Sequence, residues 1–124
     1  MMKQINFIIA IATFNRVNNL KVVIDSILKQ ELKKNVNLEV VISNSCSTDE
    51  TSSFLKSLKT NKQFHIHNKS EKIPSNTLSQ FVNFENLSKT IPKHADWVWW
   101  LGDDDKLVNN NSVQCVIDTI IENL

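Results

Sequence analysis

The chain has 124 residues, of which 41% are hydrophobic and 22% are charged, and its formal net charge is +1. These values are typical of one globular domain and exclude a disordered chain, and the near-neutral charge argues against nucleic acid as a partner. The two cysteines are too few for a disulfide framework, and no segment is apolar over the length of a membrane span. We therefore expect one cytoplasmic domain over residues 1–124. Peripheral attachment to the inner face of the membrane is left open.

The first half of the chain alternates between strand and helix patterns. The run Ile5–Ala12 is almost continuously apolar, which is typical of a strand covered on both faces. Asn18 or Asn19 can then cap a helix, whose apolar stripe consists of Leu20, Val23, Ile24, Ile27 and Leu28. Leu38–Ile42 predicts a second strand, and Ser47–Glu50 matches a capping box in which the serine caps a second helix.

The second half continues the alternation. Phe64–His67 predicts a short third strand, and a third helix is predicted between Pro74 and Pro92 from the spacing of Leu78, Phe81, Val82, Glu85 and Leu87. Trp97–Leu101 predicts a buried fourth strand, with at least two of its three tryptophans in the core. Ser112 can cap a last helix, whose apolar positions are Val113, Val116, Ile117, Ile120, Ile121 and Leu124.

This order of elements predicts an α/β fold, with a mainly parallel, Rossmann-like sheet of about four strands and helices on both faces. In such sheets, ligands bind outside the carboxyl ends of the strands. Three polar stretches follow predicted strands directly, at Thr13–Arg16, Ser43–Ser45 and Asp103–Asp105. We therefore expect them to meet at one edge of the sheet and to form a binding site.

The aspartate run is the most distinctive of the three stretches. Like charges at the end of a buried strand repel one another, and a divalent cation is the simplest group that offsets this cost. In an extended backbone Asp103 and Asp105 point to the same side and Asp104 points away. Two carboxylates on one side suit Mg²⁺ or Mn²⁺. The alternative is a solvated acidic loop that binds nothing.

The same stretches resemble the N-terminal, nucleotide-sugar-binding half of inverting family 2 glycosyltransferases, which have the GT-A fold. Ile9–Arg16 is similar to the family's first strand, which usually ends in P-T-Y-N-R. Val40–Thr51 is similar to the second strand and its V-S-D-N-x-S-T-D-x-T turn. Trp99–Asp105 is similar to the fourth strand, which ends in the D-x-D metal motif. The likeness covers nearly the whole chain and implies a partial GT-A fold.

The resemblance also implies roles for individual residues. The implied nucleotide-sugar-binding residues are Thr13, Phe14, Asn15, Arg16, Asn44, Asp103 and Asp104. Asp103 and Asp105 would hold the Mg²⁺ or Mn²⁺ that binds the donor diphosphate. Asn44 stands where the family usually has an aspartate that accepts a hydrogen bond from the base, so a weaker bond is expected there.

The function implied by this resemblance is glycosyl transfer from a nucleoside diphosphate sugar, in the synthesis of a bacterial surface polysaccharide or glycoconjugate. An inverting transfer needs a general base, and no residue before Leu124 matches one, so catalytic residues stay unknown and we expect a truncated chain. The alternative is a non-catalytic module that binds a nucleotide or metal or only assembles with a partner. A missing neighbour for the tryptophan strand also predicts a homodimer through the exposed sheet edge.

Overall fold

Helices and strands alternate along the chain in the computed structural model, which describes residues 3–45, 47–58, 64–69 and 79–124. In chain order they are β1 (Ile5–Thr13), α1 (Val17–Leu28), β2 (Val36–Ser45), α2 (Thr51–Ser57), β3 (Phe64–Lys69), α3 (Ser79–Thr90), β4 (Trp97–Trp100) and α4 (Ser112–Glu122). This order confirms the predicted α/β class. Pro74 and Leu78, which were used to predict α3, lie outside the described residues. In the described part of the chain no helix is long and apolar enough to cross a membrane.

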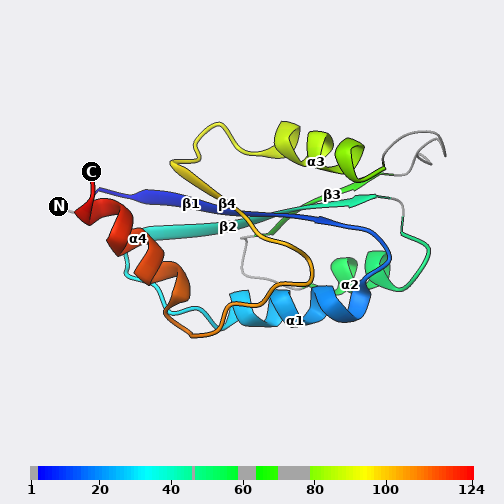
Figure 1. Ribbon diagram of the computed structural model, residues 1–124, viewed down its shortest axis with the longest axis horizontal. Coiled ribbons are helices and arrows are strands. Elements are labelled where there is room, and N and C mark those ends of the chain that lie inside the picture. Colours follow the sequence, from blue (N-terminus) through cyan, green and yellow to red (C-terminus); the bar gives the residue numbers. More distant parts are fainter. Residues whose placement is uncertain (1–2, 46, 59–63, 70–78) are drawn as a thin grey trace.

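The strands form one sheet in the order β3-β2-β1-β4, and every neighbouring pair is parallel. Helices α1 and α2 cover one face and α3 covers the other, while both chain termini lie at the end of the molecule opposite the carboxyl ends of β1 and β2 (Figure 1). The prediction of a parallel sheet with helices on both faces is therefore confirmed.

Alternate residues of β1 contribute to two separate cores, one on each face of the sheet. Phe7, Ile9 and Ile11 pack against α1 and α4, whereas Ile8 and Ala10 belong to a smaller cluster with Leu87 of α3. All five of these β1 residues are buried. A strand with both faces covered needs apolar side chains at every position, which explains the continuous apolar run in the sequence.

The tryptophan strand differs from its prediction. Within the described ranges β4 pairs only with β1 and forms an edge of the sheet, and Trp97 is 39% exposed and Trp100 is 45% exposed. Trp99 packs edge-to-face on Phe7, with 6.4 Å between the ring centroids. The expectation of a buried strand with at least two core tryptophans is therefore wrong. An aromatic, β-branched run indicates a strand, but it does not say which strand lies at the edge.

The helix starts also differ from those predicted. α1 begins at Val17, ahead of Asn18 and Asn19, and its first amide donates to Asp49 Oδ2 at 3.2 Å. α2 begins at Thr51, whose amide donates to Asp49 Oδ1 at 2.9 Å. Asp49 therefore accepts from the first amide of each helix, and the predicted serine cap of α2 is wrong. At α4 the cap position is Asn111, one residue before the predicted serine.

Candidate functional site

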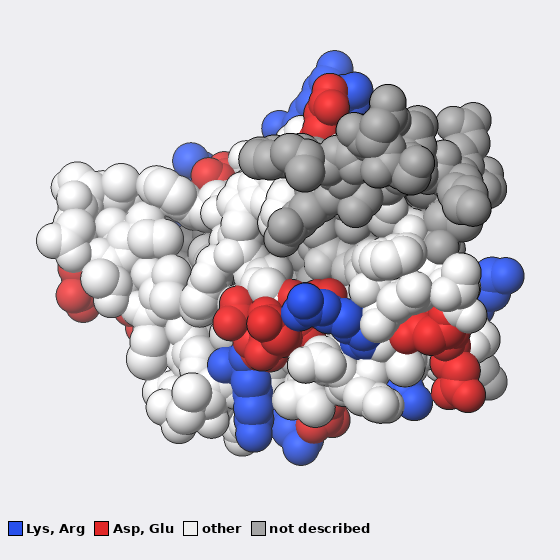
Figure 2. All heavy atoms as spheres, turned by 45° about the vertical axis from the view of Figure 1, so that its right-hand side comes forward, with Lys and Arg blue, Asp and Glu red and all other residues white. Residues whose placement is uncertain are grey.

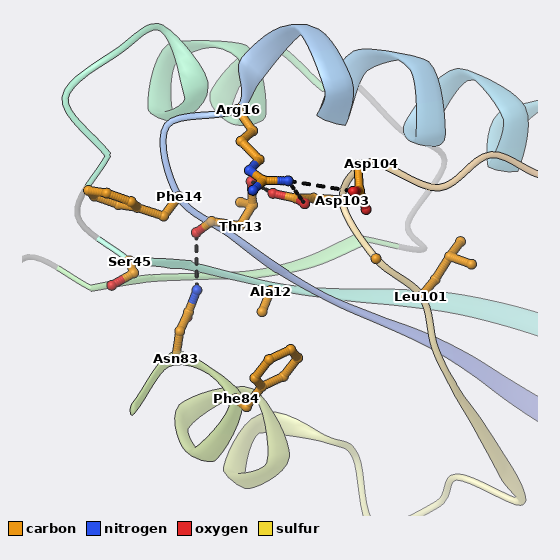
Figure 3. Close-up of a pocket in the computed structure, with 11 residues that line it drawn as sticks. Ala12, Thr13, Phe14, Arg16, Ser45, Asn83, Phe84, Leu101, Asp103 and Asp104 are labelled. Carbon is orange, nitrogen blue, oxygen red and sulfur yellow. Dashed lines mark hydrogen bonds and ion pairs between the residues drawn. The ribbon is translucent and has the colours of Figure 1, made fainter. Parts of the chain in front are cut away.

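A pocket of about 460 Å³ opens at the carboxyl ends of β1 and β4, where the sequence predicted a binding site. It is lined by Ala12, Thr13, Phe14, Arg16, Ser45, Asn83, Phe84, Leu101, Gly102, Asp103 and Asp104 (Figure 3). The register explains why these segments meet. Thr13 is level with Asn44 of β2, and the Leu101 amide donates to the Ala10 carbonyl at 3.0 Å, which brings the aspartate run beside the end of β1.

One wall of the pocket is a cluster of charged and polar side chains. Arg16 Nη1 lies 3.6 Å from Asp103 Oδ1 and 3.6 Å from Asp104 Oδ2, so one guanidinium pairs with both carboxylates (Figure 3). The Thr13 hydroxyl donates to Asp103 Oδ2 at 3.0 Å. Figure 2, which turns this end of the molecule forward, shows acidic and basic side chains lying next to one another near the centre of this face.

The environment of Asp103 makes the ionised form of its carboxyl less favourable than it would be at the protein surface. Burial raises the pKa of the Asp103 carboxyl above its ordinary value, and the neighbouring Asp104 adds to this effect. The Thr13 hydroxyl and the Arg16 guanidinium act in the opposite direction, but they do not cancel the effect of burial. A cation placed here would relieve this cost, because it would favour the ionised carboxylate.

Asp105 is arranged differently from the expectation. The chain turns at Asp103 and Asp104, and Asp105 Oδ2 accepts a hydrogen bond from the Gly102 amide at 2.8 Å. Asp103 and Asp104 therefore share Arg16 and line the pocket, whereas Asp105 does not line it. The predicted alternation, with Asp104 pointing away, is wrong because it assumed an extended backbone.

Gly102 permits this tight turn. A Cβ built at Gly102 would lie 2.8 Å from Asp105 Oδ2 and 2.9 Å from Asp104 Oδ1, closer than real Cβ atoms approach an oxygen. The backbone of Gly102 does not have a positive φ, so space around the two carboxylates, rather than backbone conformation, favours glycine here.

Asn15 joins the loop after β1 to the loop after β2. Its backbone has a φ of 50°, and its Oδ1 accepts hydrogen bonds from the amides of Thr48 at 2.6 Å and Asp49 at 3.2 Å. Its Nδ2 donates to Thr48 Oγ1 at 3.1 Å, and its own amide donates to Ser47 Oγ at 3.0 Å. Asn15 does not line the pocket, so its contacts support the loop that carries Phe14 and Arg16.

Asn44, near the carboxyl end of β2, is buried, with 1% of its surface exposed. Its Nδ2 donates to Ser52 Oγ of α2 at 2.9 Å, and its Oδ1 accepts from the Ser47 hydroxyl. The adjacent Ser45 lines the pocket instead of Asn44. In this structure the amide of Asn44 therefore holds the start of α2 against β2.

Sequence reasoning missed the contribution of α3 to the pocket. Asn83 and Phe84 form the wall opposite Arg16 (Figure 3). Asn83 is 5% exposed and lies four positions before Leu87, a core residue of the same helix face. A polar residue on the apolar face of a helix is the signal that could have identified Asn83, because buried amides are almost always hydrogen-bonded to a specific partner.

The residues of the pocket fit a divalent cation in part. In the ranges that the structure describes, no group of three or more His, Cys, Asp or Glu residues could hold a metal ion. Asp103 and Asp104 nevertheless offer two hard carboxylate oxygens to the same position, now taken by the Arg16 guanidinium. Mg²⁺ and Mn²⁺ commonly bind through one or two carboxylates and complete their shell with water and phosphate oxygens.

Comparison with known proteins adds independent observations. The sequence model described as glycosyl transferase family 2 matches residues 8–123. No curated protein matches the chain. S. aureus TarS 1-349 in complex with UDP has a similar structure, with a TM-score of 0.70 and 20% identity over 98% of this chain and 32% of TarS 1-349. The complex of TarS 1-349 with UDP-GlcNAc gives a TM-score of 0.69 and 20% identity over 98% and 32% of the two chains.

A mannosyltransferase is also similar. The mannosyltransferase PcManGT from Pyrobaculum calidifontis, in complex with GDP-Man and Mn²⁺, has a TM-score of 0.66 and 17% identity over 89% of this chain and 30% of PcManGT. At sequence identities of 17% and 20%, the likeness of this chain to PcManGT and TarS shows a common fold. The chain spans about a third of the length of these solved structures.

Proposed function

The chain belongs to glycosyl transferase family 2, and from this we propose that its pocket binds the nucleoside diphosphate sugar that donates the glycosyl group. The observation that carries the proposal is the wall formed by Thr13, Arg16, Asp103 and Asp104 at the carboxyl ends of two parallel strands. This is the place where open α/β sheets bind their ligands, and about 460 Å³ lies within the range of small-molecule sites.

The pocket offers different chemistry to each part of such a donor. Phe14 is one of the lining residues and is 49% exposed, so its ring is available for a base to stack on. Arg16 is a cation with several donors and suits a diphosphate. Two of the similar structures contain UDP or UDP-GlcNAc and one contains GDP-Man, which supports a nucleoside diphosphate sugar as the ligand class for this chain.

We further propose that Asp103 and Asp105 hold Mg²⁺ or Mn²⁺ as the D-x-D motif, or that Asp104, which also faces Arg16, takes the place of Asp105. When bound, a divalent cation stabilises the negative charge that builds on the leaving nucleoside diphosphate. The Thr13 hydroxyl fixes one oxygen of Asp103 and leaves the other facing Arg16. Asp105 can join only if its carboxylate leaves the Gly102 amide. Arg16 then exchanges its carboxylate partners for the donor phosphates.

The reaction that we propose is glycosyl transfer in the synthesis of a bacterial surface polysaccharide or glycoconjugate, with a general base supplied outside residues 1–124. The second candidate is a module that binds the donor without transferring its sugar. One observation favours it: among the described residues that line the pocket, the only carboxylates are Asp103 and Asp104, and both are paired with Arg16.

We also propose that two copies of the chain associate through the edge of the sheet. Among the described strands β4 pairs with β1 alone, and its first and last residues, Trp97 and Trp100, are substantially exposed. An unpaired strand edge beside exposed aromatic rings favours association, because it offers both hydrogen-bonding groups and apolar surface.

Isothermal titration calorimetry with UDP and with GDP tests the proposed function, in Mn²⁺ and again in EDTA. We expect one of the two nucleotides to bind in Mn²⁺, with binding lost in EDTA and in Asp103→Asn. Asp25→Asn is the matched control, because Asp25 is an exposed carboxylate that pairs with Lys29 on α1. If neither nucleotide binds, the proposal fails. Hydrolysis of UDP-GlcNAc or GDP-Man by the chain would distinguish an active enzyme from the binding module.

A further inference from the structure

Asn83 forms a polar bridge between α3 and the ends of two strands. Its Oδ1 accepts a hydrogen bond from the Ser43 hydroxyl of β2 at 2.6 Å, and its Nδ2 donates to the Thr13 carbonyl of β1 at 3.1 Å. Both contacts are buried, and Asn83 itself is 5% exposed. Because a buried hydrogen bond is costly to leave unmade, this bridge fixes the position of α3 against the strand ends.

The bridge reaches the acidic wall of the pocket through Thr13. Thr13 is the last residue of β1, and the chain leaves the sheet directly after it at Phe14 and Asn15. The Thr13 carbonyl is held by Asn83, while the hydroxyl of the same residue donates to Asp103 Oδ2 at 3.0 Å. The contacts therefore run without a break from Ser43 through Asn83 and Thr13 to Asp103.

The contacts at position 83 suit a side-chain amide. One end of the side chain accepts from a hydroxyl and the other donates to a carbonyl, and an amide carries both groups on one planar unit without a charge. An aspartate would present a carboxylate oxygen to the Thr13 carbonyl, and a leucine would leave both partners buried without a hydrogen bond.

We propose that Asn83 is a positioning residue of the donor site: by holding the end of β1, it keeps the Thr13 hydroxyl on Asp103 and so orients that carboxylate toward the ligand. This inference rests on the proposed function, because the ligand is taken to be a nucleoside diphosphate. It adds α3 to the site, since Asn83 also lines the pocket on the side opposite Arg16 (Figure 3).

The test measures the dissociation constant of UDP and of GDP in Mn²⁺ for Asn83→Ala, Thr13→Val and the double variant. We expect each single change to weaken binding about fivefold, the effect of one lost hydrogen bond. The double variant should bind no more than about fivefold more weakly than the wild type, because both changes disturb the same carboxylate. If the loss of affinity in the double variant equals the product of the two single losses, Asn83 does not act through Thr13.

Asn86→Ala is the matched control, because Asn86 lies on the same helix and does not line the pocket, and its buried Nδ2 has no hydrogen-bond partner among the residues that the structure describes. We expect its affinity to equal that of the wild type, and an equal loss in Asn86→Ala would overturn the inference. Circular dichroism checks that each variant is folded. If Asn83→Ala does not fold, Asn83→Ser, which keeps a hydroxyl in the site, replaces it with the same expected loss.

The outcomes separate the two proposals. If the wild type binds UDP or GDP and Asn83→Ala binds it equally well, the role of Asn83 is wrong and the proposed function stands. If the wild type binds neither nucleotide, the proposed function fails and the inference fails with it.

Discussion

Gly102→Ala should weaken donor binding while leaving the stability of the fold almost unchanged. The new Cβ would lie 2.8 Å from Asp105 Oδ2 and 2.9 Å from Asp104 Oδ1, and ordinary van der Waals contact begins at 3.4 Å. Both carboxylates must therefore move away by about 0.5 Å. They can do so, since the side chain of Asp104 is 58% exposed, but the movement takes Asp104 out of its place beside Arg16.

The effects on stability oppose one another. Losing the hydrogen bond from the Gly102 amide to Asp105 costs about 1 kcal/mol. Replacing glycine by alanine where φ is not positive stabilises a protein by about 0.4–1 kcal/mol, because the unfolded chain loses conformational freedom. The net change in the free energy of unfolding should be below about 1 kcal/mol, or a shift of about 4 °C in Tm.

The effect on the ligand has no such compensation. A displaced carboxylate contacts the cation or diphosphate poorly, and we expect the dissociation constant of UDP or GDP in Mn²⁺ to rise about fivefold to tenfold. Calorimetric titration and thermal unfolding of the same samples measure the two effects. Asp105→Ala is the companion variant for thermal unfolding alone, because it removes the same hydrogen bond without adding bulk but also removes a carboxylate proposed to hold the metal. An unchanged dissociation constant in Gly102→Ala would refute the reasoning, as would a large fall in Tm.

Three further predictions follow from other contacts. Because burial raises the pKa of Asp103, the folded protein keeps the Asp103 proton to higher pH than the unfolded chain does, and the free energy of unfolding falls as pH rises through the interval just above the ordinary carboxyl pKa. Asp103→Asn should therefore have a higher Tm than the wild type at pH 7 and a similar Tm at about pH 3. A lower Tm of the variant at pH 7 in thermal unfolding would contradict this. Asn15→Ala should lower the free energy of unfolding in urea by about 2–3 kcal/mol, through lost hydrogen bonds and a φ of 50°. Asn15→Gly should lose about 1 kcal/mol less, because glycine tolerates that φ, and equal losses would remove the backbone argument. Sedimentation velocity should give a dimer for the wild type and a monomer when Trp97 and Trp100 are both changed to Lys, whereas a wild-type monomer at high concentration would rule out association through β4.

The central strands could be predicted from the sequence because their burial leaves a direct pattern. β1 is covered on both faces, so Phe7 through Ile11 must all be apolar. The run Trp97–Trp100 is as apolar, yet β4 lies at the edge. Its position depends on strand order, which local composition does not encode, so the prediction of a buried strand failed, and the exposed edge was expected only from the family resemblance.

The details of the site depended on contacts between distant segments. The capping box at Ser47–Glu50 is a local pattern, but Asn15 from the first loop takes the amides of Thr48 and Asp49. The predicted roles of Asp103 and Asp105 assumed a continuing strand, and the turn at Gly102 changed which carboxylates face Arg16. Residue types and their order along the chain were enough to predict that Thr13–Arg16 and the aspartate run meet at one edge of the sheet, whereas side-chain direction needed the three-dimensional structure.

The placement of the acids beyond an edge strand has a consequence for hydrogen exchange. β4 is four residues long and pairs with one neighbour, so it can open locally without disturbing the pairing of β1 with β2. Such an opening releases the amides from Trp97 to Leu101 and moves Asp103 and Asp104 away from Arg16. A ligand that binds these carboxylates must suppress the opening, so the exchange rates of β4 amides should report how fully the pocket is occupied.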